Sequence, residues 1–461
     1  MALRSGFSSR LGFVAAASGS AVGLGNIWAF PYITGENGGA AFLLIYICCT
    51  FLIGFPIMVG EIAVGRKAKA NPYGAYKLLG GKRWSVVGLL GILCGIMILS
   101  FYNVVAGWAF GYFIQIGFGD LLAQGDFGSF FGGYVADYSD NLVYSFVFMV
   151  LTAIIVIGGV KQGIELAAKI LMPFLFIILF GLIIYAMTLD NAMDGLAFYL
   201  KPDFSLVNAK TIYSAFGQAF FSLSLGMGAL ITYGSYISKN ENIISAAAIV
   251  TVADVLVAFL AGLLIFPLVF SQGQDPTEGP GLVFVVLPGV FQQIGPIAGR
   301  VIGGGFFLLL CMAALTSTIS LLEVPVAYFV DQKKWPRKLV VAGLAAVVFS
   351  IGLLSMLSQG AVDGLTNFLF YEGKSQTFLD FISHVFLDVS LPLGGFLLSI
   401  FVAYKLKTKN LSEEIAHGNS GYVGSNIEKF INFSLTVLCP IALGIIFVVT
   451  VLQKFGNVHI F

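Results

Sequence analysis

Two glycine-rich stretches decide the fold: Ser18-Gly19-Ser20-Ala21-Val22-Gly23-Leu24-Gly25-Asn26 and Ser222-Leu223-Ser224-Leu225-Gly226-Met227-Gly228. Each lies in the middle of a long apolar segment. Glycine inside a helix costs roughly 1 kcal/mol relative to alanine, so both stretches predict a break in a helix. In hydrocarbon, the backbone groups at a break require a partner, which a ligand or another side chain must supply.

The composition excludes a soluble protein. Of the 461 residues, 58% are apolar and 10% are charged, whereas soluble domains carry roughly 25% charged residues. The net charge of +1 gives no indication of nucleic-acid binding. We expect the cysteines to pack as small apolar residues without forming disulfides. They are Cys48, Cys49, Cys94, Cys311 and Cys439.

Apolar segments long enough to cross a bilayer recur along the whole chain. They predict an all-α integral membrane protein with about eleven transmembrane helices. We place these helices at residues 11–34, 39–64, 86–117, 142–158, 164–188, 208–237, 242–270, 297–328, 338–357, 378–404 and 430–453, joined by short loops. The first segment shows no cleavage-site pattern, so we expect no cleaved signal peptide.

Charge alternates between the loops. Basic residues such as Arg66, Lys333 and Lys405 gather in every second loop, and acidic residues such as Asp126 and Asp275 lie in the loops between them. Cytoplasmic loops are enriched in lysine and arginine. We therefore expect a multi-pass protein of the cell membrane, embedded in the lipid bilayer, with a cytoplasmic amino terminus.

The two predicted breaks occupy corresponding positions in two five-helix halves. This arrangement is the best sequence indication of the midplane site of an inverted-repeat transporter. Close helix packing at glycines explains the same residues, but the polar neighbours favour a binding site. They are hard oxygen donors, which suit an alkali-metal ion better than zinc or copper. They are Ser20, Asn26, Ser222, Ser224, Asp254, Thr316 and Ser317.

Two carboxylates, Glu61 and Asp254, lie inside apolar segments. An ionisable group at membrane depth is costly and by default indicates function. We interpret Glu61 as a cap for the amides of a broken helix, and Asp254 as the better ion ligand.

Four motifs resemble the bacterial branch of the neurotransmitter:sodium symporter family: Gly19-Ser20-Ala21-Val22-Gly23-Leu24-Gly25-Asn26-Ile27-Trp28, Glu36-Asn37-Gly38-Gly39, Gly226-Met227-Gly228 and Leu315-Thr316-Ser317. The resemblance implies the LeuT fold, a 5+5 inverted repeat with broken helices 1 and 6. The first repeat would cover residues 1–188 and the second 189–405. Residues 406–461 would form a cytoplasmic loop and one extra helix.

The same resemblance implies two sodium sites and one substrate site. The first sodium would be bound by Ala21, Asn26, Ser222, Asp254 and the substrate carboxylate. The second would be bound by Gly19, Val22, Ala313, Thr316 and Ser317. The substrate would contact Ser20, Ala21, Gly23, Leu24, Gly25, Ile98, Tyr102, Phe221, Ser224, Met227, Ser317 and Leu321.

Family features outside the central site are also present. Arg4 and Asp331 match the inner gate pair, with Phe7 at the aromatic position beside it. Gly163 and Pro173 match a pattern that lets helix 5 unwind.

The resemblance also indicates the class of substrate. Gly23 stands where family members that carry biogenic amines have an aspartate, so we expect an amino acid with an apolar or aromatic side chain. Asp254 stands where many members have a neutral asparagine and chloride-dependent members use a bound chloride. We therefore expect transport without chloride.

The sequence departs from the family at the outer gate. Trp28-Ala29-Phe30-Pro31 lacks the arginine of the gate, and Ser383 stands where the aspartate partner belongs. How the outer side closes is therefore open.

Other classes of protein fit less well. An enzyme would need a nucleophile and base, or metal ligands, at depth, and we expect the histidines at helix ends: His384, His417 and His459. A channel would need a continuous polar lining. The favoured function is sodium-coupled symport of a small amino acid by alternating access. A non-transporting sodium-dependent sensor, or a transporter of a related non-standard amino-acid-like substrate, is the alternative. Monomer and homodimer stay open.

Overall fold

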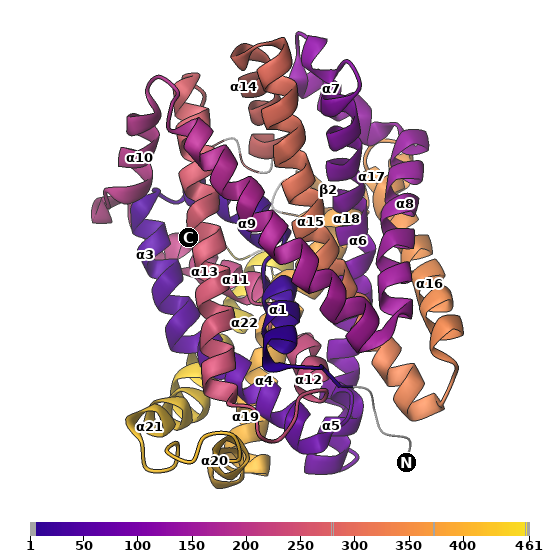
Figure 1. Ribbon diagram of the computed structural model, residues 1–461, viewed down its shortest axis with the longest axis vertical. Coiled ribbons are helices and arrows are strands. Elements are labelled where there is room, and N and C mark those ends of the chain that lie inside the picture. The colour runs from indigo at the N-terminus through magenta and orange to yellow at the C-terminus, as the bar shows by residue number, and fades with distance from the viewer. Residues whose placement is uncertain (1–5, 278, 280, 372–373, 457, 459–461) are drawn as a thin grey trace.

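The protein is a bundle of long helices that run mostly along the long axis of the molecule (Figure 1). The computed structural model describes residues 6–277, 279, 281–371, 374–456 and 458. We call the end of the bundle that carries α5, α20 and α21 the lower end. The end that carries α7 and α14 is the upper end.

Nine continuous helical segments in the described residues are long and apolar enough to cross a membrane. They are Ala40–Ala68 (α3 Ala40–Cys49, α4 Phe55–Ala68), Ser85–Gly117 (α6), Tyr138–Ile157 (α8), Val160–Ala186 (α9 Leu166–Ala186), Ile243–Ser271 (α13), Pro296–Lys333 (α15 Pro296–Tyr328), Arg337–Leu357 (α16), Phe378–Leu406 (α18 Phe378–Ser383, α19 Ser390–Ile400) and Asn426–Phe455 (α21 Asn426–Phe433, α22 Cys439–Phe455). The predicted all-α class is confirmed.

The two remaining predicted spans are the broken ones. The first consists of α1 (Arg10–Ala21), a π-helical turn (Gly25–Ala29) and α2 (Phe30–Glu36), and its two parts meet at 46°. The sixth consists of α11 (Ala209–Ser222) and α12 (Ala229–Gly234), which are too short to span a bilayer individually. The predicted number of about eleven is reached if each of these pairs forms one span.

Prolines explain the π-helical turns that interrupt several of the spans. These turns end two residues before Pro31, Pro56, Pro288 and Pro440. Proline has no N–H, and its ring collides with the carbonyl of the residue four positions earlier. The preceding turn widens to relieve that collision, so the spans bend without losing their helical course.

Polar caps fix where several helices begin. The Ser9 hydroxyl accepts a hydrogen bond from the Gly12 amide at 3.1 Å and starts α1. Asn208 and Asn242 do the same for α11 and α13, each accepting at 3.0 Å. A side-chain oxygen at this position satisfies an amide that has no partner within the helix.

The prediction that short loops join the spans is wrong at several places. The loops contain the helices α5 (Pro72–Gly80), α7 (Phe127–Ala136), α10 (Ala192–Leu200), α14 (Leu287–Ile294), α17 (Asp363–Thr366) and α20 (Thr408–Ala416). They also contain an antiparallel hairpin in which Leu369 of β1 (Leu369–Tyr371) pairs with Gln376 of β2 (Lys374–Gln376). A search for membrane-length apolar runs does not detect such short elements.

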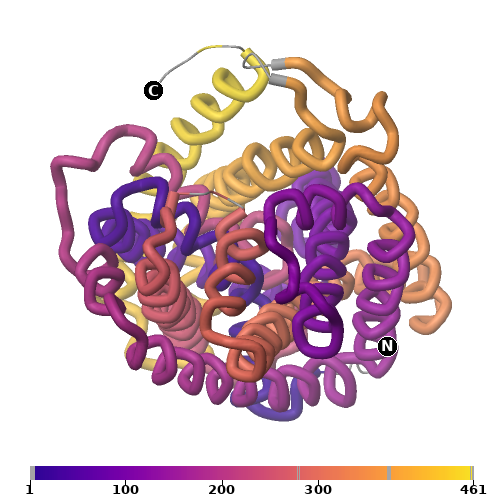
Figure 2. Tube along the Cα trace, turned by 90° about the horizontal axis from the view of Figure 1, so that it is seen from above, coloured from indigo at the N-terminus to yellow at the C-terminus, as the bar shows by residue number. Residues whose placement is uncertain are grey.

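Burial separates a central helix from a peripheral one. In the most apolar part of Pro296–Lys333, 83% of residues are buried within the protein, against 28% for Asn426–Phe455. Helix α15 therefore belongs to the centre of the bundle, and α22 faces its surroundings. Figure 2 shows α22, in yellow, at the edge of the bundle seen from above.

A buried ion pair fastens α20 to the lower end. Arg66 of α4 is fully buried, and its Nε donates to Glu414 Oε1 of α20 at 2.8 Å. Its Nη1 donates to the backbone carbonyl of Glu241 at 2.6 Å, in the loop before α13. One guanidinium thus joins three segments that are far apart in the sequence.

Replacement of this arginine is expected to destabilise the fold. Arg66→Met leaves the buried Glu414 carboxylate without its partner, which typically costs about 3–5 kcal/mol. Thermal unfolding in detergent, followed by size-exclusion chromatography, should show a lower midpoint. Lys67→Met, at a neighbouring and more exposed position, is the control and should unfold like the unsubstituted protein. Equal midpoints for Arg66→Met and the control would contradict this account.

Candidate functional site

The first break lies between α1 and α2. Val22 leaves the helix with φ −74° and ψ 102°, and the backbone amides that follow bond to side chains. The Gly23 amide donates to Asn26 Oδ1 at 3.0 Å, and the Leu24 amide donates to the Tyr102 hydroxyl at 2.9 Å. The two amides are therefore paired with side chains and not with helical carbonyls.

The second break covers residues 223–228 between α11 and α12. Gly226 and Gly228 have φ of 82° and 79°, values that glycine adopts without strain. Ser224 has φ 54°, which is unusual for a residue with a side chain. Its hydroxyl donates to the backbone carbonyl of Ser20 at 2.8 Å. This bond joins the two breaks and holds Ser224 in its conformation.

Three of the residues predicted for the first sodium site form one buried cluster. Asn26 Nδ2 lies 2.8 Å from both Ser222 Oγ and Asp254 Oδ1, and Ser222 Oγ donates to the same carboxylate oxygen at 2.7 Å. All three side chains are at most 1% exposed. Ala21, the fourth residue predicted there, is the last residue of α1. The cluster collects hard oxygen atoms around one carboxylate at the meeting point of the two breaks.

Two residues of this region were missed in the sequence. The Tyr46 hydroxyl donates to Asp254 Oδ2 at 3.0 Å, and Gln218 Nε2 donates to the backbone carbonyl of Gly25 at 2.6 Å. Tyr46 lies in an apolar run, where an aromatic ring suggests packing. Its hydroxyl group was the one feature that could have indicated a polar contact. Gln218 is a polar residue inside a predicted span, which could have singled it out.

The residues predicted for the second sodium site also come together. Thr316 Oγ1 donates to the carbonyl of Ala313 at 2.9 Å, and the carbonyl of Val22 lies 3.3 Å from the same atom. A Cβ added at Gly19 would lie 3.2 Å from Thr316 Cβ. Ser317 differs, because its hydroxyl points to the carbonyl of Ser20 at 3.4 Å. Ser317 therefore lies between this group and a small cavity that it also lines.

Of the twelve residues predicted to contact the substrate, all except Leu24 line one small cavity. Its volume is about 20 Å³, so an amino-acid side chain enters only when the lining moves. Met227 is suited to such movement because its side chain is flexible. The residues that line the cavity are Ser20, Ala21, Gly23, Gly25, Ile98, Tyr102, Phe221, Ser224, Met227, Ser317 and Leu321.

The interpretation of Glu61 as a cap agrees with its contacts. Glu61 of α4 is 1% exposed, and its Oε1 accepts a hydrogen bond from the Gly226 amide at 2.8 Å. Gly226 lies in the second break. The carboxylate thus stabilises an unwound backbone that water does not reach.

The predicted inner gate lies at the lower end. Arg4 lies outside the described residues, so its pairing with Asp331 stays a prediction. Asp331 Oδ2 accepts a hydrogen bond from Asn71 Nδ2 at 3.1 Å. The ring of Phe7 packs edge-on against Phe13 and Tyr233 at 5.6 and 5.7 Å. Aromatic side chains thus cover the start of α1.

Helix 5 contains both residues of its predicted unwinding pattern. Gly163 lies in the π-helical turn Val160–Glu165, and Pro173 lies inside α9. A Cβ at Gly163 would lie 1.9 Å from the carbonyl oxygen of Ile155, so the turn requires glycine. Pro173 lacks the N–H that would continue the helical hydrogen bonds.

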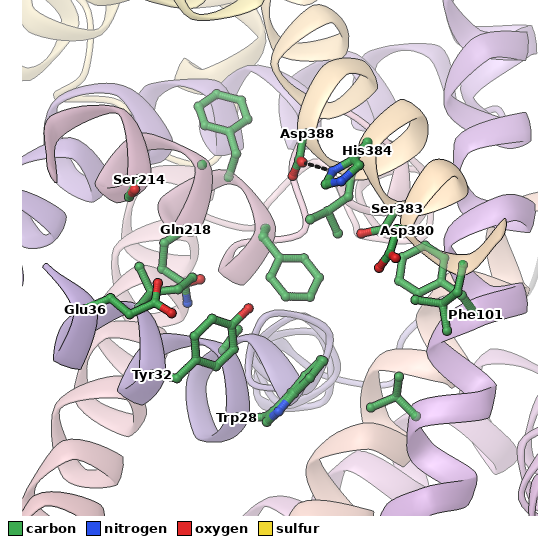
Figure 3. Close-up of a pocket in the computed structure, with 18 of the residues that line it drawn as sticks. Trp28, Tyr32, Glu36, Phe101, Ser214, Gln218, Asp380, Ser383, His384 and Asp388 are labelled. Atoms are coloured by element: carbon green, nitrogen blue, oxygen red, sulfur yellow. Dashed lines mark hydrogen bonds and ion pairs between the residues drawn. The ribbon is translucent and has the colours of Figure 1, made fainter. Parts of the chain in front are cut away.

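A larger cavity of about 540 Å³ lies toward the upper end. Ala29 and Ser383 both line it, at the positions of the missing outer gate pair, and Phe221 borders both this cavity and the small one. Figure 3 shows Tyr32, Glu36 and Gln218 on one side of the cavity and a polar group on the facing helix. That group consists of Asp380, Ser383, His384 and Asp388.

The prediction for His384 is wrong. It lies inside the span Phe378–Leu406, in a π-helical turn, and its Nδ1 lies 2.7 Å from Asp388 Oδ2. His417 lies at the end of α20, as expected, and His459 lies outside the described residues.

Comparison with known proteins gives the family. The sequence model of the sodium:neurotransmitter symporter family matches residues 4–124 and 138–459. The chain belongs to this family. It is therefore a sodium-dependent transporter and a multi-pass membrane protein, and the prediction that it is not an enzyme is confirmed.

Individual relatives agree with this assignment. The sodium-dependent transporter YhdH of Bacillus subtilis is 38% identical over 96% of each chain. A sodium-dependent transporter of Haemophilus influenzae is 35% identical over 89% of this chain and 91% of its own. The crystal structure of MhsT in complex with L-phenylalanine is 44% identical, with a TM-score of 0.88, over 97% of this chain and all of that one. The LeuT fold is thus confirmed.

Gly23 offers a direct test of the small cavity. A Cβ at this position would lie 2.3 Å from Ser317 Oγ and 2.7 Å from the Tyr102 hydroxyl. Overpacking of this kind costs about 1–3 kcal/mol. Gly23→Ala should therefore weaken sodium-dependent amino-acid binding roughly 10- to 100-fold, measured by scintillation proximity on purified protein. Gly181→Ala, where the added Cβ meets no atom within 4 Å, should leave binding unchanged. Binding of equal strength in both variants would refute the proposed position of the substrate.

Proposed function

We propose that this transporter imports an apolar or aromatic amino acid together with sodium, without chloride, by alternating access. The observation that carries the proposal is the buried cluster of Asn26, Ser222 and Asp254 at the meeting point of the two breaks. It supplies a negative charge and hard oxygen atoms in a place without water, which suits a sodium ion.

The position of the substrate follows from the amides beside this cluster. The backbone at Gly23 and Leu24 offers N–H groups at the beginning of a helical segment, where a carboxylate is favoured. The Tyr102 hydroxyl lies next to them. A carboxylate bound there would be close to Asn26 and Asp254, so the first sodium and the substrate would share a ligand.

The choice of an amino acid over an amine rests on Gly23. An aspartate at this position would collide with Ser317 and Tyr102, because even a Cβ has no room there. The substrate therefore has to bring its own carboxylate. Its side chain would meet Ile98, Leu321 and Met227, which are buried and apolar.

The second sodium is proposed at Thr316 and the carbonyls of Val22 and Ala313. Val22 directly follows α1, and Ala313 and Thr316 belong to α15, so an ion there would join the first break to the centre of the bundle. Unwinding of helix 5 at Gly163 would expose this ion from the lower end. The lower end is proposed to be cytoplasmic, in agreement with the loop charges, and residues 1–188 and 189–405 are proposed as the inverted repeats.

Uptake into proteoliposomes tests the function. We expect an inward Na⁺ gradient to drive accumulation of leucine, phenylalanine or tryptophan above equilibrium, and an equal K⁺ gradient to drive none. Replacement of external chloride by gluconate should leave the rate within about twofold, since Asp254 supplies the fixed charge. Binding without accumulation would instead support the sensor alternative. Accumulation that requires chloride would contradict the chloride-independent mechanism.

Removal of the Asp254 charge tests the first sodium site. Asp254→Asn keeps the size of the side chain but loses a charged interaction of about 1.5–3 kcal/mol. The sodium concentration for half-maximal binding should rise roughly 10- to 100-fold, and added chloride should recover part of the loss. Asp363→Asn, at an exposed position at the start of α17, is the control. A sodium dependence that does not change in Asp254→Asn would place the ion elsewhere.

A further inference from the structure

The serine hydroxyls of the small cavity donate their hydrogen bonds to other atoms of the protein. Three of the residues that line it are serines, and each hydroxyl donates to a protein oxygen. Ser20 Oγ donates to Ser320 Oγ at 2.7 Å, and Ser224 Oγ and Ser317 Oγ donate to the carbonyl of Ser20 at 2.8 and 3.4 Å. A hydroxyl has one proton and two acceptor lone pairs. The three serines therefore retain only acceptor capacity.

The direction of the Ser20 hydrogen bond is fixed by its neighbour. Ser320 Oγ donates its own proton to the carbonyl of Ser317 at 2.9 Å, so Ser20 has to be the donor in the Ser20–Ser320 pair. No described residue donates a hydrogen bond to Ser20 Oγ. Ser20 is 1% exposed, so bulk water does not reach this hydroxyl. Ser20 Oγ can therefore accept a hydrogen bond from a ligand.

The surroundings make this acceptor selective. The other residues around the side-chain part of the cavity are Ile98, Leu321, Met227 and Phe221, which offer no N–H or O–H from their side chains. Ser317 and Tyr102 lie beside Gly23, where the proposed pose puts the substrate carboxylate, and Ser224 belongs to the second break. An N–H or O–H on the substrate side chain would therefore find one acceptor in an apolar compartment, where a hydrogen bond discriminates between otherwise similar ligands.

We propose that Ser20 Oγ is a specificity-determining acceptor that selects aromatic amino acids whose side chain carries a hydrogen-bond donor. The inference rests on the proposed amino-acid transport and narrows its substrate class to indole and phenol side chains, as in tryptophan and tyrosine. A purely structural role, in which Ser20 only joins α1 to α15, predicts no such selectivity.

A pair of nearly isosteric ligands tests the proposal without any substitution. 3-Benzothienyl-L-alanine has a sulfur atom where tryptophan has the indole N–H. In sodium-dependent competition against radiolabelled leucine on the purified full-length protein, tryptophan should bind about 3- to 10-fold more tightly. Equal affinity of the two ligands would overturn the inference.

Two variants assign the effect to the residue. In Ser20→Ala the ratio of tryptophan affinity to analogue affinity should fall to about one, because the acceptor is gone. Both ligands are compared within the same variant, so the ratio does not depend on how strongly that variant binds leucine. Thr318→Ala is the control: it removes the buried hydroxyl pair that Thr318 of α15 forms with Thr152 at 2.8 Å, and Thr318 does not line the cavity. This variant should keep the ratio. If tryptophan still binds more tightly than its sulfur analogue in Ser20→Ala, or if this preference is lost equally in Thr318→Ala, Ser20 is not the residue that selects the substrate.

The result separates the inference from the function on which it rests. If the wild-type protein binds leucine and tryptophan in sodium but does not distinguish tryptophan from its sulfur analogue, the inference fails and the proposed function stands. If it binds none of these amino acids in sodium, the proposed function fails, and the inference fails with it.

Discussion

The structure depends on one constraint, which is that backbone N–H and C=O groups in the middle of a membrane have to be paired. Two helices give up their internal hydrogen bonds at the same depth, at residues 22–24 and 223–228. The protein pairs the freed groups with side chains from other helices: Asn26 and Tyr102 at the first break, and Glu61 at the second. These bonds are strong because water does not compete for them. They are also the bonds that a polar ligand can replace.

The same constraint explains why polar residues concentrate at one place in a chain that is otherwise apolar. Asp254 accepts hydrogen bonds from Asn26, Ser222 and Tyr46, which come from three different spans. An unpaired carboxylate at this depth would cost several kcal/mol. Each donor lowers that cost, and together they hold the turn Gly25–Ala29, α3, α11 and α13 in register at the site.

Much of this arrangement could be predicted from the sequence. Glycine clusters in apolar runs predict both breaks. Asp254 predicts a buried charged site, because a carboxylate is costly in hydrocarbon unless it has a function. Tyr46 could not be recognised in the same way, since tyrosine is common in membrane helices. His384 was misplaced because its neighbours suggest a helix end, whereas a π-helical turn carries it into the upper cavity. The short helices at the two ends of the bundle depend on caps and tertiary contacts such as Arg66–Glu414, which no local pattern shows.

The side chain of Asn26 links the binding of a cation to the binding of a carboxylate. Its Nδ2 donates to Asp254, and its Oδ1 accepts a hydrogen bond from the Gly23 amide. A cation beside Asp254 needs the oxygen of this amide group, not the nitrogen, so the side chain has to turn when the ion arrives. This rotation of the side chain releases the Gly23 N–H, which can then donate a hydrogen bond to a carboxylate. Ion and carboxylate would thus each favour the binding of the other through a single amide group, and by thermodynamic linkage the gain is the same in both directions.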